Sequence, residues 1–140
     1  MPRSAQTGTR GISGDLPRRQ RNYSFFEGDP ASREPIRQRL AGQNLILTSQ
    51  LSRLECRCRP LRDKNTVLLG LYDVFFSGQD LRLIEIDSRV IDQATRIRAD
   101  FNLKSPEALH LAAAIIGGAS IFLTGDRQLA RFDPLPVEII

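Results

Sequence analysis

One stretch of the chain, Leu103 to Arg127, restricts its possible folds more than any other. Pro106 suits the first turn of a helix, and Ser105 before it is expected to cap that helix. The apolar residues that follow end at Gly117-Gly118, which predicts the end of the helix. Residues 119–124 then form a short apolar run between turn residues, a pattern typical of a strand buried on both faces. The stretch therefore predicts a helix, a tight turn and a strand inside a sheet.

Two acids flank this helix and strand. Glu107 lies in the first turn of the predicted helix, and Asp126 follows the predicted strand at its carboxyl end, where open α/β sheets bind ligands. Two carboxylates at one sheet edge repel each other unless a cation or a proton separates them, so the pair suggests a metal site. Each also has a plainer interpretation. Glu107 stabilises a helix dipole by about 0.3–1 kcal/mol, and Asp126-Arg127 forms an ordinary turn with a local ion pair.

Helices and strands alternate along the rest of the chain. The other predicted strands are residues 44–48, 81–86 and 137–140, and the other predicted helices are residues 32–40, 49–60, 65–76 and 87–101. This order predicts an α/β fold with a mainly parallel central sheet flanked by helices, in a single domain at residues 25–140. The strand at residues 137–140 is expected at the edge of the sheet.

The net charge of +4 is confined to the start of the chain. Residues 1–24 contain five arginines and one acid, whereas residues 25–140 contain 15 basic and 15 acidic residues. We therefore expect a disordered basic tail before a neutral domain, and nucleic-acid binding has to be argued from a site. The chain has no apolar run near the roughly 20 residues of a membrane helix. With only Cys56 and Cys58, which point apart on a helix, a cytoplasmic protein without membrane contact is expected.

Glu55 is the third candidate acid, one turn into the helix that follows the strand ending at Thr48. Ser52 and Glu55 have the spacing of a capping box, in which Glu55 only satisfies backbone donors. Ser49 is the better cap for this helix, which leaves Glu55 able to face the same edge as Asp126. His110 is the only histidine, so a zinc site is not expected, and oxygen ligands favour Mg²⁺ or Mn²⁺.

Three blocks of sequence, in order, resemble the PIN-domain nucleases, and in particular the VapC-like toxins of toxin–antitoxin pairs. The blocks are TSQLSRLE at residues 48–55, SPEALHLAAA at residues 105–114 and FLTGDRQL at residues 122–129, with EGDP at residues 27–30 as a further match. The resemblance implies an endoribonuclease that uses Mg²⁺ or Mn²⁺, an RNA substrate, a small antitoxin partner and a homodimer. The residues that it assigns are the acids Glu55, Glu107 (where the family usually has Asp) and Asp126. For this activity we expect the hydroxyl of Thr124 to orient a carboxylate or a water, and Arg53, Arg57 or Arg127 to contact the RNA backbone.

One part of the family pattern is not matched in the sequence. The family carries an Asp at the end of an apolar first strand, whereas here the corresponding region is rich in Gly and Arg, and Asp15 is the only nearby acid. We therefore expect either a lost first strand or a chain that begins at a wrong start or in a wrong reading frame, and a weak nuclease in both cases. A second hypothesis is a catalytically impaired binding module, and a third is a structural α/β protein that binds no divalent cation.

Overall fold

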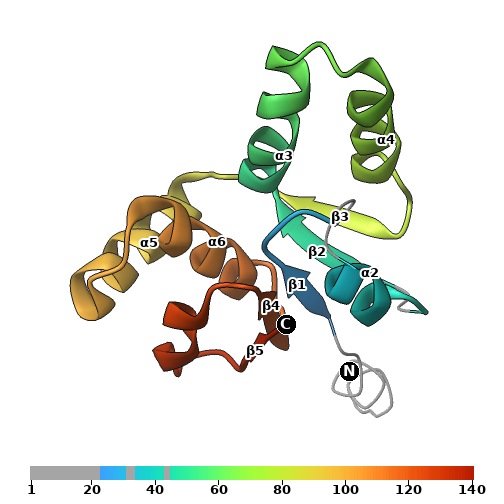
Figure 1. The fold of residues 1–140 in the computed structure, drawn as a ribbon. Coiled ribbons are helices and arrows are strands. Elements are labelled where there is room, and N and C mark those ends of the chain that lie inside the picture. Colours follow the sequence, from blue (N-terminus) through green and yellow to red (C-terminus); the bar gives the residue numbers. More distant parts are fainter. Residues whose placement is uncertain (1–22, 31–33, 43–44) are drawn as a thin grey trace, which may run out of the picture.

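The structure is a computed structural model that describes residues 23–30, 34–42 and 45–140 (Figure 1). Its centre is a five-stranded sheet in the order β3-β2-β1-β4-β5, and every neighbouring pair is parallel. The strands are β1 (Ser24–Phe26), β2 (Ile46–Ser49), β3 (Leu81–Ile84), β4 (Ile121–Thr124) and β5 (Val137–Ile139). The helices are α2 (Glu34–Leu40), α3 (Gln50–Arg62), α4 (Thr66–Phe76), α5 (Ser88–Phe101), α6 (Ser105–Ile116) and the 3-10 helix η1 (Arg127–Arg131). The α/β fold with a parallel sheet is confirmed, and β5 lies at the edge as expected.

The central strand β1 corrects the expectation that the first strand is missing. Residues 24–26 pair with β2 on one side and with β4 on the other. All three side chains of β1 are buried, which is why a run of only three residues holds the middle of the sheet. The strand begins one residue before the expected domain start at residue 25. Residues 1–22 of the tail predicted at residues 1–24, including Asp15, lie outside the described residues.

The two faces of the sheet are covered by different helices. Phe25 faces α5 and α6 and stacks on Phe122 of the neighbouring strand, with the ring centroids 5.3 Å apart. Phe26 points to the opposite face, where it joins Leu123 and the buried residues Ile36 and Leu40 of α2. This alternation along β1 and β4 fixes the pairing register, because a slip by one residue would exchange the two faces.

The structure confirms one predicted helix cap and corrects two other predictions about helix ends. Ser49 caps α3, because its hydroxyl accepts a hydrogen bond from the Ser52 backbone nitrogen at 3.3 Å. The helix does not stop near Pro60 but continues to residue 62, since a proline in the last turn removes only one hydrogen bond near the helix end. Ser105 is not the cap of α6. Lys104 holds that position without a side-chain cap, and Ser105 instead accepts a hydrogen bond from Arg98.

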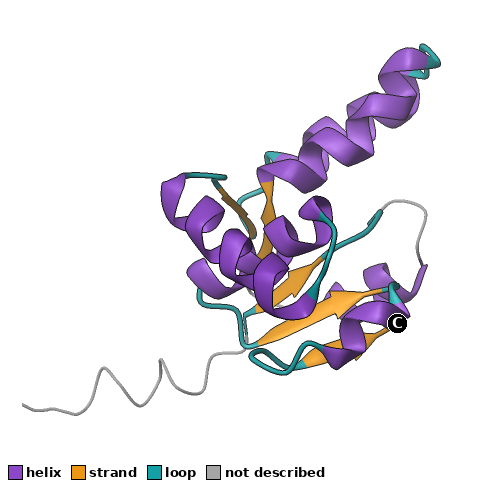
Figure 2. Ribbon diagram, turned by 90° about the vertical axis from the view of Figure 1, so that its left-hand side faces the viewer, coloured by secondary structure: helices purple, strands orange, loops and turns teal. Residues whose placement is uncertain are grey.

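Helices α3 and α4 form an antiparallel pair that extends away from the sheet (Figures 1 and 2). Large apolar side chains are exposed on this pair: Leu54, Leu61, Val67, Leu71 and Val74. No described helix is both long and apolar enough to cross a membrane. The pair borders the sheet edge at which the candidate site lies.

Asp87 caps α5 and gives the fold a pH dependence that can be measured. Its carboxylate accepts a hydrogen bond from the Val90 backbone nitrogen at 3.1 Å, and this bond, together with the nearby Arg89, lowers the pKa of Asp87. A lowered pKa in the folded state stabilises the fold above the ordinary Asp value of about 3.9, and the effect is lost as the pH falls through the folded pKa. We expect Asp87→Ala to lower the melting temperature by roughly 2–8 °C at pH 7.

The loss in Asp87→Ala should be smaller at pH 2 than at pH 7, because a growing fraction of the wild-type cap is protonated as the pH falls. Thermal melts at the two pH values measure this difference. Asp92→Ala is the matched control, because Asp92 is an exposed acid of the same helix that does not cap it. An equal loss at both pH values would show that the charge of Asp87 does not stabilise the helix.

Candidate active site

The carboxyl ends of the two central strands bring together an acid, a hydroxyl and a second acid. Glu27 follows β1 directly, and its backbone nitrogen donates to the Leu123 carbonyl at 2.9 Å. The buried Thr124, at the end of β4, donates its hydroxyl proton to Oε1 of Glu27 at 2.6 Å. The same hydroxyl accepts a hydrogen bond from the Asp126 backbone nitrogen at 3.0 Å. Thr124 therefore links the two strand ends that carry Glu27 and Asp126.

Asp126 is held by the start of η1. Its Oδ1 accepts a hydrogen bond from the Gln128 backbone nitrogen at 3.0 Å, so the side chain caps the short helix. In the described part of the chain, Oδ2 of Asp126 has no hydrogen-bond partner. One oxygen fixes the side chain, and the other remains available to a ligand.

Helix α3 meets helix α6 through a carboxylate and an imidazole. Oε1 of Glu55 lies 2.9 Å from Nε2 of His110. His110 is only 2% exposed, whereas the side chain of Glu55 is 42% exposed. Glu107 stands one turn before His110 on α6, and residues three apart lie on the same helix face. Glu55 is thereby directed towards the face of α6 that carries Glu107.

A chain of buried hydroxyls fixes the strand ends beneath these acids. Thr48 lies 2.9 Å from the Phe26 carbonyl and 2.8 Å from the hydroxyl of Ser52. Since Thr48 has one proton, it donates to the carbonyl and accepts from Ser52. The carbonyl of the residue before Glu27 is thus tied to the first turn of α3, which limits the movement of Glu27 relative to Glu55.

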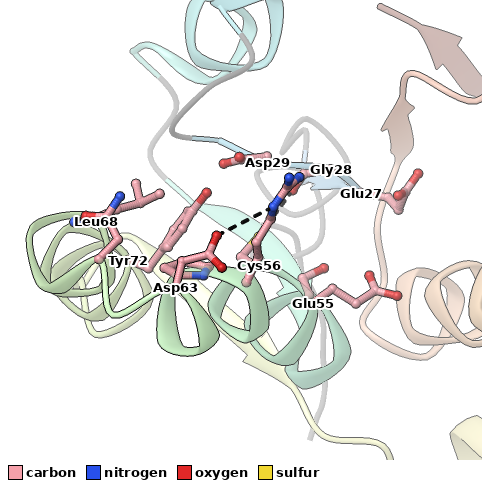
Figure 3. Close-up of a pocket in the computed structure, with 12 residues that line it drawn as sticks. Glu27, Gly28, Asp29, Glu55, Cys56, Asp63, Leu68 and Tyr72 are labelled. Atoms are coloured by element: carbon pink, nitrogen blue, oxygen red, sulfur yellow. Dashed lines mark hydrogen bonds and ion pairs between the residues drawn. The ribbon is translucent and has the colours of Figure 1, made fainter.

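A pocket of about 460 Å³ opens beside Glu27 and Glu55 (Figure 3). Four of its twelve lining residues are acidic, and one is an arginine. The lining residues are Glu27, Gly28, Asp29, Ser52, Glu55, Cys56, Arg59, Pro60, Asp63, Asn65, Leu68 and Tyr72. In Figure 3 the side chains of Glu27 and Glu55 lie together on one side of the pocket. Asp29, Asp63 and Tyr72 lie away from them. The pocket therefore connects the acid of β1 with the acid of α3.

Two weak acids in the pocket stay protonated near neutral pH. Burial, followed by the negative charges of Asp29, Glu55 and Glu27, raises the pKa of Cys56 to about 12. Burial also raises the pKa of Tyr72, and its hydrogen bond to Asp29 and the charge of that residue add to the effect. The carboxylates of Glu27, Asp29, Glu55 and Asp63 are therefore the groups in the pocket that carry negative charge near neutral pH.

Comparison with known proteins identifies the domain. The sequence profile of the PIN domain matches residues 23–135. The chain belongs to the PIN domain family. The match begins just before β1, as expected if β1 is the first strand of the domain. PIN domains are nucleases as a family. No curated protein matches the sequence of this PIN domain.

Solved structures share the fold at low sequence identity. A toxin–antitoxin complex from Klebsiella pneumoniae matches with a TM-score of 0.66 and 18% identity, over 84% of this chain and 99% of that chain. DNA-bound VapBC from Salmonella typhimurium matches with a TM-score of 0.68 and 15% identity, over 84% and 98%. VapBC-5 from Mycobacterium tuberculosis matches with a TM-score of 0.61 and 17% identity, over 84% and 97%. In each of these complexes, the matched chain shares the PIN fold with this chain over almost its whole length.

Two of the three predicted acids of this PIN domain, Glu55 and Asp126, are held by contacts that the structure shows. Glu55 contacts His110 on the helix that carries Glu107, while Asp126 is joined to Glu27 through Thr124. Within the described residues there is no group of three or more His, Cys, Asp or Glu side chains positioned to hold a metal. The expected convergence of Glu55, Glu107 and Asp126 therefore stays a prediction.

The three predicted RNA-contacting arginines differ in their surroundings. Arg57 is directed to α4, where its Nε lies 3.2 Å from Oδ1 of Asp73 at an angle too poor for a hydrogen bond. Arg53 is half-buried two residues before Glu55, a spacing that points the two side chains apart. Arg127 is exposed directly beside Asp126. Of the three, Arg127 is best placed to contact a ligand held at the sheet edge.

Glu27 was missed in the sequence because it was assigned to the turn EGDP. The signal that indicates its position is an acid directly after the apolar run at residues 23–26, the same arrangement as Asp126 after β4. In the structure Glu27 stands at the end of the central strand, where the PIN family carries its first acid.

Proposed function

We propose that the chain is a divalent-metal-dependent endoribonuclease of the VapC toxin type, which hydrolyses phosphodiester bonds of RNA. The observation that carries the proposal is the link from Glu27 through Thr124 to Asp126 at the carboxyl ends of β1 and β4. Ligands bind at this edge of open parallel sheets. Glu55 borders the same pocket as Glu27, which adds a carboxylate from a third element.

The donor atoms fit Mg²⁺ or Mn²⁺ in kind. Glu27, Glu55, Glu107 and Asp126 supply carboxylate oxygens, which are the ligands that these hard cations prefer. When bound, the metal activates a water and stabilises charge on the phosphate. The chain's own contribution is orientation, because Thr124 holds one oxygen of Glu27 while Asp126 is fixed through Oδ1. Arg127, with Arg53 and Arg57 as weaker candidates, would bind the RNA backbone.

The partners belong to the same proposal. Solved structures with this fold are toxin–antitoxin complexes, which supports a small antitoxin as a binding partner. We also propose a homodimer and a cytoplasmic location, as the resemblance to VapC toxins implies. The molar mass of the purified chain in solution tests the dimer.

The impaired binding module is the weaker alternative. Its main support was the missing acid of the first strand, and Glu27 now occupies the end of that strand. Two features still favour it. Glu27 is one methylene longer than the Asp of the family, and the described residues hold no preformed group of three metal ligands. A cleavage assay separates the two functions.

Removing divalent cations should abolish RNA cleavage by the purified chain. We expect excess EDTA to reduce the cleavage rate of a labelled single-stranded RNA at least about 100-fold, because the carboxylates alone cannot activate water at neutral pH. Adding back Mn²⁺ or Mg²⁺ in excess over the chelator should restore the rate, and Zn²⁺ should restore less. The measurement is gel analysis of the cleavage products over time. Cleavage that persists in EDTA, or no cleavage with any cation, would contradict the proposal.

A further inference from the structure

The single histidine of the chain is bonded at both ring nitrogens. His110 is 2% exposed on α6, with Nε2 2.9 Å from Oε1 of Glu55 and Nδ1 3.3 Å from Oγ of Ser49. Both partners belong to the start of α3, since Ser49 is its cap and Glu55 lies in its second turn. One buried side chain of α6 therefore fixes both the beginning of α3 and its acid.

The hydrogen-bond pattern determines which ring nitrogen carries the proton. An ionised Glu55 carboxylate can only accept, so Nε2 of His110 must donate to it. Oγ of Ser49 already accepts from the Ser52 backbone nitrogen and can donate its own proton to Nδ1. Donation from Nε2 to Glu55 and from the Ser49 hydroxyl to Nδ1 together satisfies these contacts.

The same three residues do not form a nucleophilic triad. Ser49 has no exposed surface, and its oxygen is used as the helix cap. A nucleophile must reach its substrate, which this hydroxyl cannot do. Glu55, at 42% exposure, is the only member of the three that reaches solvent and the pocket. The contacts of His110 and Ser49 therefore serve to hold Glu55.

We infer that His110 is a positioning residue that holds the carboxylate of Glu55 in the orientation needed to bind a divalent cation, with Ser49 fixing the tautomer. The inference rests on the proposed function. A half-exposed glutamate has three side-chain torsions and would otherwise sample many directions in solvent. The bond from His110 uses Oε1 of Glu55, so Oε2 remains for a cation. Outer partners of metal-binding carboxylates typically change metal affinity 10–100-fold.

A pair of amide substitutions tests the inference. Gln at position 110 can place a donor near the original Nε2, whereas Asn is shorter and reaches only towards Ser49. We expect His110→Asn and His110→Leu to raise the Kd for Mn²⁺ at least about tenfold, and His110→Gln to restore most of the affinity. Calorimetric titration of the full chain with Mn²⁺ gives the Kd, and RNA cleavage is measured in parallel. Leu111→Val is the matched control for a buried change on the same helix, and it should leave the Kd unchanged.

A double-mutant cycle separates positioning from a general effect on the fold. In the Glu55→Gln background, His110→Asn should change the Mn²⁺ Kd by less than about twofold, because the residue through which it acts is already altered. Equal losses in both backgrounds, or equal affinities of the Asn and Gln variants, overturn the inference. If the wild type binds Mn²⁺ and cleaves RNA while His110→Asn does both equally well, the inference fails and the proposed function stands. If the wild type neither binds Mn²⁺ nor cleaves, both fail.

Discussion

Asp126→Asn should reduce metal-dependent RNA cleavage at least about 100-fold without unfolding the protein, since altering even outer partners of a metal site costs 10–100-fold. Asn keeps a carbonyl oxygen that can accept the bond from the Gln128 nitrogen, so the start of η1 is preserved. The substitution removes the negative charge that would bind the cation. Gel-based cleavage rates and circular dichroism spectra of the two proteins measure the two parts of this prediction.

Asp133→Asn is the matched control for this substitution. Asp133 is an exposed acid seven positions further along the chain, outside the sheet edge, so the same loss of charge should leave cleavage unchanged. If Asp126→Asn cleaves RNA as fast as the wild type, the assignment of the site to the ends of β1 and β4 is wrong. A fall in both variants would indicate a general effect of net charge on RNA binding.

Local patterns predicted those parts of the fold that short segments determine. The cap Ser49 and the edge position of β5 both followed from local sequence. Each prediction uses only residues that lie close together in the sequence. For the same reason the alternation of strands and helices predicted the parallel sheet.

The central strand could not be predicted in this way. Ser24–Phe26 has three residues and follows an Arg-rich segment, so its local signal is that of an apolar cluster before a turn. Its position depends on pairing with β2 and β4, the latter almost 100 residues away in sequence. Long-range pairing of this kind is set by packing of the whole sheet and leaves no signature in the segment itself.

The arrangement of the site was predicted only in part for the same reason. Glu55, Glu107 and Asp126 are candidates because each has a local marker, namely a strand end or a helix start. The contact of Glu55 with His110 joins residues 55 positions apart, and that of Thr124 with Glu27 joins residues 97 positions apart. Sequence spacing predicted the sheet edge near which each acid lies. The hydrogen-bond partner of each acid depends on the tertiary fold.

Glu27→Gln is the second substitution with a large expected effect, and it tests whether β1 supplies the first acid of the site. The carbonyl oxygen of Gln can still accept the hydroxyl proton of Thr124, so the end of β1 should remain in place. The lost charge should reduce Mn²⁺-dependent cleavage at least about 100-fold, as for other carboxylates of a metal site. Glu27→Asp, which restores the residue type usual in the PIN family, should retain cleavage. Cleavage rates over a range of Mn²⁺ concentrations measure all three proteins.

Glu85→Gln is the control that matches this change most closely. Glu85 follows β3 directly, as Glu27 follows β1, but β3 is the edge strand two positions away in the sheet. Removing the negative charge of Glu85 should therefore leave the cleavage rate unchanged. An active Glu27→Gln combined with an inactive Asp15→Asn would instead place the first acid in the N-terminal segment, and β1 would then have only a structural role. The opposite result would establish that β1 forms the centre of the sheet and that Glu27, directly after it, is a ligand of the metal. A position at a strand end holds a carboxylate more rigidly than a loop does.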